Sequence, residues 1–71
     1  MFQYKTIKFD ITNNTIIINN PTLTARMAIN NLLLDIKKIY DVTLEVKYMN
    51  NQAIINNFKD FDLAKLGITK I

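Results

Sequence analysis

The sequence predicts a small α+β domain, an open-faced sandwich in which one long and one short helix cover one face of an antiparallel sheet of about four strands. Asn-Asn pairs separate segments in which apolar and polar residues alternate, which is typical of β-hairpins. A segment in the middle of the chain instead repeats apolar residues at the spacing of an amphipathic helix. The expected element order is ββαββα, in a single domain of residues 1–71.

The first two strands are expected to meet at Asn13-Asn14, because asparagine accepts the positive φ angles of a two-residue hairpin turn. In that register Ile11 faces Ile16, and Phe9 faces Ile18. One side of the hairpin is then continuously apolar. We expect this side to face the core.

A long helix is expected to begin between Pro21 and Thr24, because proline ends the preceding strand and the threonines can cap a helix. One broad arc of this helix is apolar and should face the core: Ala25, Ala28, Ile29, Leu32, Leu33, Ile36, Ile39 and Tyr40. Three large apolar residues lie almost opposite this arc, among polar and charged neighbours, and should be exposed: Leu23, Met27 and Leu34.

The segment Val42–Tyr48 alternates apolar and polar residues, which predicts a half-buried strand with Tyr48 on its core side. A second two-residue turn at Asn50-Asn51 would place Val46 opposite Ile55.

The residues from Phe58 to Leu66 have a spacing compatible with a short second helix. Asn57 or Asp60 would be its N-cap, and Gly67 falls where a glycine commonly ends a helix. A short tail, residues 68–71, follows.

The composition excludes most catalytic chemistry. Cysteine, histidine, serine and tryptophan are all absent, which removes disulfides, thiol and imidazole chemistry, serine nucleophiles and the usual zinc ligands. The single glycine, Gly67, cannot form a phosphate-binding loop, and the nearby carboxylates Asp60 and Asp62 fit a helix N-terminus better than an acid/base pair. We therefore expect no enzyme, no metal and no cofactor.

Apolar runs in the sequence are at most three residues long, and the N-terminus has no signal-like stretch. These features predict a soluble, cytoplasmic protein that does not enter the membrane. The many isoleucines, asparagines and lysines, against one arginine, fit AT-rich codons and hence a low-GC bacterium or its phage.

From Thr15 onward the chain has three isoleucines, a polar turn, the start of a long helix, a strand with a hairpin, and a Leu-Gly-Ile sequence. The residues are Ile16–Ile18, Leu23–Ala28, Val42–Glu45, Asn56 and Leu66–Ile68. This order resembles the histidine-containing phosphocarrier (HPr) family of the sugar phosphotransferase system over about four fifths of the chain. The resemblance implies an HPr-like open-faced sandwich that docks its partners around the start of the long helix.

Neither phosphorylation site of that family remains in this sequence. Thr24 stands where the family has its phosphoacceptor histidine, Met27 replaces a proline, and Lys59 falls near the regulatory serine. A threonine phosphoester is too stable to pass its phosphate on, so the resemblance implies a degenerate member without carrier activity. An extra N-terminal strand, residues 2–10, is expected to lie beside residues 15–18 and to replace a strand that the family has near its C-terminus.

The apolar side chains opposite the core arc predict a surface for a protein partner, because large exposed apolar patches usually meet one. The HPr-like docking region adds Thr24 and Arg26. We expect a non-enzymatic binding or regulatory module, such as a phage-type, host-directed inhibitor or a phosphocarrier mimic. Its partner-binding residues would be Leu23, Thr24, Arg26, Met27 and Leu34.

Each of these residues also has a structural interpretation. The three apolar residues could pack against the second helix or against Ile68 and Ile71 in the tail. Thr24 could be a helix cap or first-turn residue, and Arg26 a solvated charge.

Two other functions stay open. A small nucleic-acid-binding protein is compatible with the net charge of +3 and with Phe2, Tyr4 and Tyr48 as residues on which bases could stack. A self-assembling structural subunit is the other, because a domain of this size without disulfide or metal often gains stability by forming a homo-oligomer.

Overall fold

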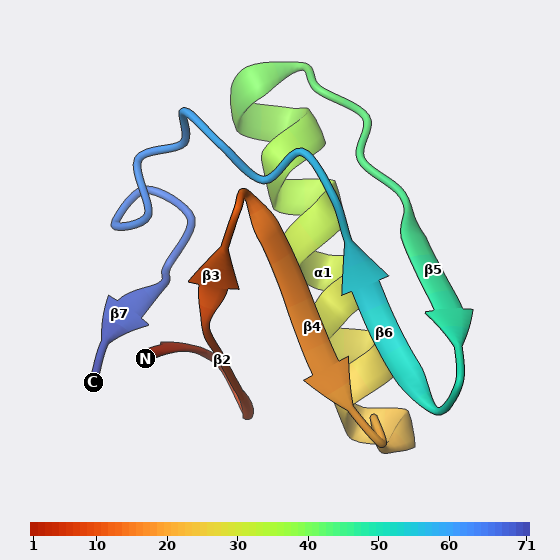
Figure 1. Ribbon diagram of the computed structural model, residues 1–71. Coiled ribbons are helices and arrows are strands. Elements are labelled where there is room, and N and C mark those ends of the chain that lie inside the picture. Colours follow the sequence, from red (N-terminus) through yellow and green to blue (C-terminus); the bar gives the residue numbers. More distant parts are fainter.

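Seven short strands and one long helix make up the structure, a computed structural model that describes all of residues 1–71 (Figure 1). The strands are β1 (Phe2–Tyr4), β2 (Ile7–Phe9), β3 (Ile11–Thr12), β4 (Thr15–Asn19), β5 (Val46–Met49), β6 (Gln52–Ile55) and β7 (Thr69–Lys70), and the helix is α1 (Leu23–Tyr40). The predicted α+β class with antiparallel strands is confirmed. The predicted single sheet, second helix and ββαββα order are wrong.

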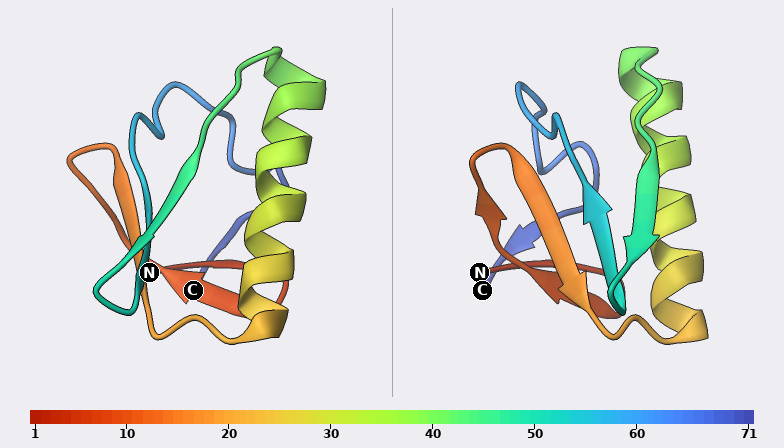
Figure 2. Two further views of the ribbon diagram at one scale, coloured as in Figure 1. Left: turned by 90° about the vertical axis from the view of Figure 1, so that its right-hand side faces the viewer. Right: turned by 45° about the vertical axis from the view of Figure 1, so that its right-hand side comes forward.

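The larger sheet has the strand order β3-β4-β6-β5, and α1 packs across one of its faces (Figures 1 and 2). Both predicted Asn-Asn hairpin turns are present, with φ between 51° and 60° at all four asparagines. The predicted registers are also confirmed, since Ile11 pairs with Ile16 and Val46 pairs with Ile55. The two hairpins join through β4 and β6, where Ile16 pairs with the same Ile55.

The N-terminal segment departs from the prediction, because residues 2–10 do not form one strand beside β4. The chain turns back at Lys5, which has φ of 51°, and β1 and β2 pair so that Phe2 lies opposite Phe9. Phe9 therefore does not pair with Ile18. The turn explains the burial pattern: Tyr4 and Ile7 would face opposite sides of a continuous strand, but both are buried here.

Helix α1 begins and ends with specific caps. The Thr22 side chain accepts a hydrogen bond from the backbone N–H of Ala25 at 3.1 Å, and Asp41 adopts a left-handed conformation with φ of 56° at the C-terminal end. Five residues of the predicted core arc are buried: Ala25, Ala28, Ile29, Leu32 and Ile36. Leu33 and Tyr40 are partly buried, whereas Ile39 in the last turn is exposed, contrary to the prediction.

The strand predicted for Val42–Tyr48 forms only from Val46 onward. Its partner β6 ends at Ile55, opposite Val46, so the preceding residues have no strand to pair with. Tyr48 was expected on the core side, but 42% of its surface is exposed because it lies at the open edge of the sheet.

The predicted second helix is replaced by a loop with one tight turn. Asn57 and Asp60 have φ of 61° and 63°, values that interrupt a right-handed helix. Hydrogen bonds between residues three apart then form a short turn over Asp62–Gly67, and Gly67 has the predicted left-handed conformation with φ of 77°. The tail continues as β7, which pairs with β1 to complete the small sheet β2-β1-β7.

The core contains no buried polar or charged residue. Its buried side chains come from both sheets, from α1 and from the loop before β7: Tyr4, Ile7, Phe9, Ile16, Ile18, Ala25, Ala28, Ile29, Leu32, Ile36, Ala53, Ile55, Phe58, Leu66 and Ile68. The small sheet thus closes one side of the same core that α1 covers.

Candidate functional site

The side of α1 that faces away from the large sheet carries three exposed apolar residues. Leu23 is 75% exposed, Met27 60% and Leu34 64%, as the helical spacing predicts. We call these three residues the outer stripe. Because they recur at intervals of four and seven residues, they line up along one side of the helix.

No other segment of the chain covers the outer stripe. The second helix that was expected to do so is absent, Ile68 is buried in the core, and Ile71 is exposed at the C-terminus beside the small sheet (Figure 1). The alternative in which the stripe packs within the protein is therefore wrong. The stripe is surface.

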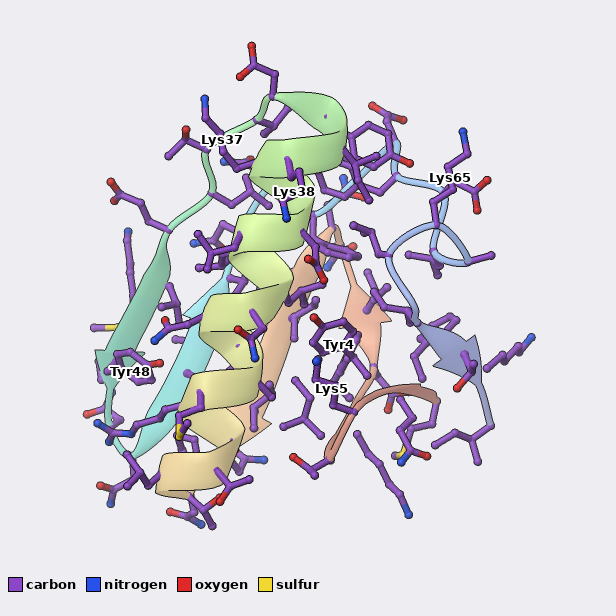
Figure 3. The ribbon with its side chains drawn as sticks, turned by 180° about the vertical axis from the view of Figure 1, so that it is seen from behind. Tyr4, Lys5, Lys37, Lys38, Tyr48 and Lys65 are labelled. Carbon is purple, nitrogen blue, oxygen red and sulfur yellow. The ribbon has the colours of Figure 1, made fainter.

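Positive charges border the outer stripe. Lys38 follows Leu34 by one helical turn, and Lys37 forms an ion pair with Asp41 at 2.8 Å (Figure 3). The single acidic residue within α1 is Asp35, which lies on the side of the small sheet and accepts a hydrogen bond from the Tyr4 hydroxyl at 2.7 Å. An apolar surface with cations at its border favours an apolar partner surface that carries carboxylates.

Arg26 is held by a contact that the sequence analysis missed. Its guanidinium lies 4.7 Å from the centre of the Tyr48 ring, so it joins α1 to β5. A cation–π contact at a partly exposed site stabilises by about 0.5–1 kcal/mol. Arg26 is therefore more than a solvated charge, and Tyr48, outside the predicted site, belongs to its surroundings.

Thr24 is an exposed residue in the first turn of α1. The capping role belongs to Thr22, two residues earlier, so of the two structural interpretations of Thr24 the first-turn residue is confirmed. The structure thus places Leu23, Thr24, Arg26 and Met27 on the first turns of one helix, with Leu34 two turns further along.

A second exposed apolar surface lies on the outer face of the large sheet. Ile17 on β4 is 46% exposed and pairs with the partly buried Ile54, and Met49 on β5 is 53% exposed. Ile17 was visible in the sequence as an isoleucine on the polar side of its strand. Met49 gave no such signal, because the predicted strand ended at Tyr48.

One titratable group of the structure is clearly perturbed, the hydroxyl of Tyr4. Burial raises the pKa of the Tyr4 hydroxyl well above its usual range, and the hydrogen bond to Asp35 and the charge of that carboxylate raise it further. The neutral hydroxyl is a hydrogen-bond donor that links β1 to α1. No group of three or more histidine, cysteine or acidic side chains is arranged to hold a metal ion.

No helix of the structure has both the length and the apolar character that crossing a bilayer requires. Comparison of the chain with protein-family models, with curated proteins and with solved structures finds no match.

Proposed function

We propose that this protein is a non-enzymatic binding module that docks a protein partner through the outer stripe of α1. The observation that carries the proposal is the exposure of three large apolar side chains, Leu23, Met27 and Leu34, along a helix whose opposite side already fills the core. Apolar side chains aligned on one side of a helix are a common means of binding a groove on another protein.

The border of the stripe defines the chemistry of the partner. Arg26 and Lys38 flank the stripe, and the carboxylate of Asp35 is directed to Tyr4 on another side of the helix. The partner surface should therefore be an apolar groove with carboxylates along its rim. Opposite charges at such a rim accelerate association and fix orientation more than they increase affinity.

A narrower form of the proposal follows from the HPr-like resemblance. In it, the module occupies the docking site that a phosphocarrier uses on its partners, with Thr24, Arg26 and Met27 at the contact. It would then slow phosphate transfer to a true phosphocarrier without accepting phosphate itself. A competition assay with the general phosphotransfer enzyme and radiolabelled phosphoenolpyruvate tests this form directly.

Two methionines provide a matched pair of variants for the general proposal. Met27→Asp places a carboxylate in the stripe, where association would bury it unpaired, and this penalty is enough to abolish a micromolar complex. Met49→Asp makes the same change at a similarly exposed methionine outside the stripe. Both variants should melt within a few degrees of the parent, because both side chains are exposed.

The experiment compares proteins captured from a low-GC bacterial lysate by the parent and by each variant, followed by titration with the purified candidate partner. We expect a partner that binds the parent and Met49→Asp equally and does not bind Met27→Asp. The proposal is wrong if Met27→Asp keeps every partner, or if it lowers the melting temperature steeply. A steeply salt-dependent affinity for DNA or RNA would favour the nucleic-acid alternative.

A further inference from the structure

The strand β5 forms a free edge of the large sheet. It pairs with β6 on one side, and no strand, helix or loop lies along its other side (Figures 1 and 2). The opposite edge strand, β3, has only two residues and leads directly into the small sheet. A free edge exposes unpaired backbone groups that can pair with another extended strand.

The hairpin geometry shows which backbone groups of β5 are unpaired. Residues that flank a two-residue turn exchange hydrogen bonds, and such pairs alternate along a hairpin, so Met49 and Lys47 bond to β6. The hydrogen bond from Asn20 N–H to the Asn51 carbonyl fits the same alternation on the other side of β6. The N–H and C=O groups of Val46 and Tyr48 therefore point to the open side of β5.

We propose that β5 pairs antiparallel with β5 of a second copy of this chain, with Val46 of one copy opposite Val46 of the other. In this register residues 44 and 45, which precede β5 and pair with no strand in the single chain, extend β5 across the seam. Residues 46 and 46, and residues 44 and 48, then become hydrogen-bonded pairs that satisfy the outward backbone groups. The two larger sheets then join into one continuous sheet about a two-fold axis. The inference goes beyond the proposed function, since it rests on the backbone of the sheet edge.

Charge complementarity selects this register. With Val46 at the centre, Glu45 of each copy lies opposite Lys47 of the other, so that both cross-strand pairs attract. A shift by two residues in one direction places Glu45 opposite Glu45, and a shift in the other direction places Lys47 opposite Lys47. Shifts by one residue lose the backbone hydrogen bonds.

The side chains on the helix side of the seam also fit together. Leu44 of one copy would lie beside Tyr48 of the other, which is 42% exposed in the single chain. A hollow of about 440 Å³ opens beside Leu44, between α1 and the segment that leads into β5, and Leu33 and Leu34 form the rest of its apolar wall. In the proposed register the tyrosine ring of the second copy would lie beside this hollow.

Charge reversal and charge exchange test the dimer. Sedimentation equilibrium of the parent from micromolar to millimolar concentration should show a mass that rises from 8.3 kDa towards twice that value. Glu45→Lys and Lys47→Glu should each weaken self-association about tenfold or more, because each creates two like-charge pairs. The double variant that carries both substitutions restores opposite charges and should regain the parent's affinity.

A cysteine cross-link gives a second measurement in a chain without native cysteines. Val46→Cys places two thiols across the two-fold axis, at a Cα separation of about 5.5 Å that a disulfide can span. It should form a covalent dimer rapidly on mild oxidation. Met49→Cys on the same strand is the control and should not, because the register puts the two copies of residue 49 far apart.

The inference is overturned if the parent remains a monomer up to millimolar concentration. It is also overturned if the double variant fails to regain the self-association affinity that each single variant loses. Equal cross-linking rates of Val46→Cys and Met49→Cys would also contradict it. Circular dichroism of each variant confirms that the fold is retained, so that lost association is not mistaken for unfolding. None of these results depends on whether the outer stripe binds a partner.

Discussion

The two sides of α1 contain similar apolar residues but meet different surroundings. On the inner side Ile29, Leu32 and Ile36 have no exposed surface, because the larger sheet and the small sheet close over them. On the outer side Leu23 and Met27 contact mainly water. The comparison shows that the fold uses one side of the helix for its stability, and that the apolar character of the other side needs a different explanation.

The largest effect should come from the inner side. Leu32→Ala removes a fully buried side chain and leaves a cavity, which costs about 2–4 kcal/mol in the free energy of unfolding. A loss of this size can unfold much of so small a domain. Urea denaturation followed by circular dichroism measures it, with Leu34→Ala as the exposed control that should change stability by less than about 0.5 kcal/mol. Equal losses at the two positions would show that the sides of α1 have been assigned wrongly.

The two threonines at the start of α1 should also differ in how much they contribute to stability. Thr22 accepts the hydrogen bond from Ala25 that begins α1, so Thr22→Ala should cost about 1 kcal/mol. Thr24 lies within the first turn and is exposed, so Thr24→Ala should be neutral or slightly stabilising, because alanine has the higher helix propensity. Thermal melting of the two variants compares them. A larger loss of stability for Thr24→Ala than for Thr22→Ala would show that the helix begins at a different residue.

Tyr4 joins the small sheet to α1. Its partner on the helix lies between the buried inner side and the exposed outer side. Tyr4→Phe removes the hydroxyl that donates to Asp35 at 2.7 Å and should cost about 1 kcal/mol at neutral pH. Folding raises the pKa of this hydroxyl, so the folded state holds the proton more tightly than the unfolded chain. The stabilisation is complete below the ordinary tyrosine pKa of about 10, and it is lost as the pH rises above that value.

The pH dependence provides the measurement for Tyr4. The free energy of unfolding of the parent should fall more steeply above about pH 10 than that of Tyr4→Phe, so that the two curves converge. Parallel curves for the parent and Tyr4→Phe would contradict the raised pKa.

The parts of the fold that local sequence signals describe were predictable. The Asn-Asn turns fixed the registers of both hairpins of the large sheet, and the helical period separated Leu32 from Leu34 correctly. The small sheet was not predictable in this way. Its turn contains Lys5, which is no typical turn residue, and its other pairing joins Phe2 to Lys70 from opposite ends of the chain.

The candidate site likewise has features that local sequence signals predict and features that they do not. The exposure of Leu23, Met27 and Leu34 followed from helical geometry alone, since the spacing of a helix fixes which residues lie opposite its buried side. The contact between Arg26 and Tyr48 did not, because it depends on where β5 lies relative to α1. Likewise, the residues Phe58–Leu66 looked helical in spacing, but Asp60 has φ of 63°, which interrupts a right-handed helix. The backbone N–H of Phe58 instead bonds to the Asn14 carbonyl of the first hairpin, a contact that the local spacing does not show.

The smallest effect on stability, and the sharpest test of the comparison, concerns Leu23 in the outer stripe. Leu23 is the first residue of α1 and the first turn contains no acidic residue, so Leu23→Asp adds a negative charge where the helix dipole favours one. Stability should rise by about 0.3–1 kcal/mol. Binding of a partner through the stripe should fall, because association would bury that carboxylate.

Met27→Asp lies further into the helix and should lose binding with almost no gain in stability. Thermal melting and binding titrations on both variants measure the two effects separately, and a drop in stability at Leu23 would show that the outer side of α1 contributes to the fold after all.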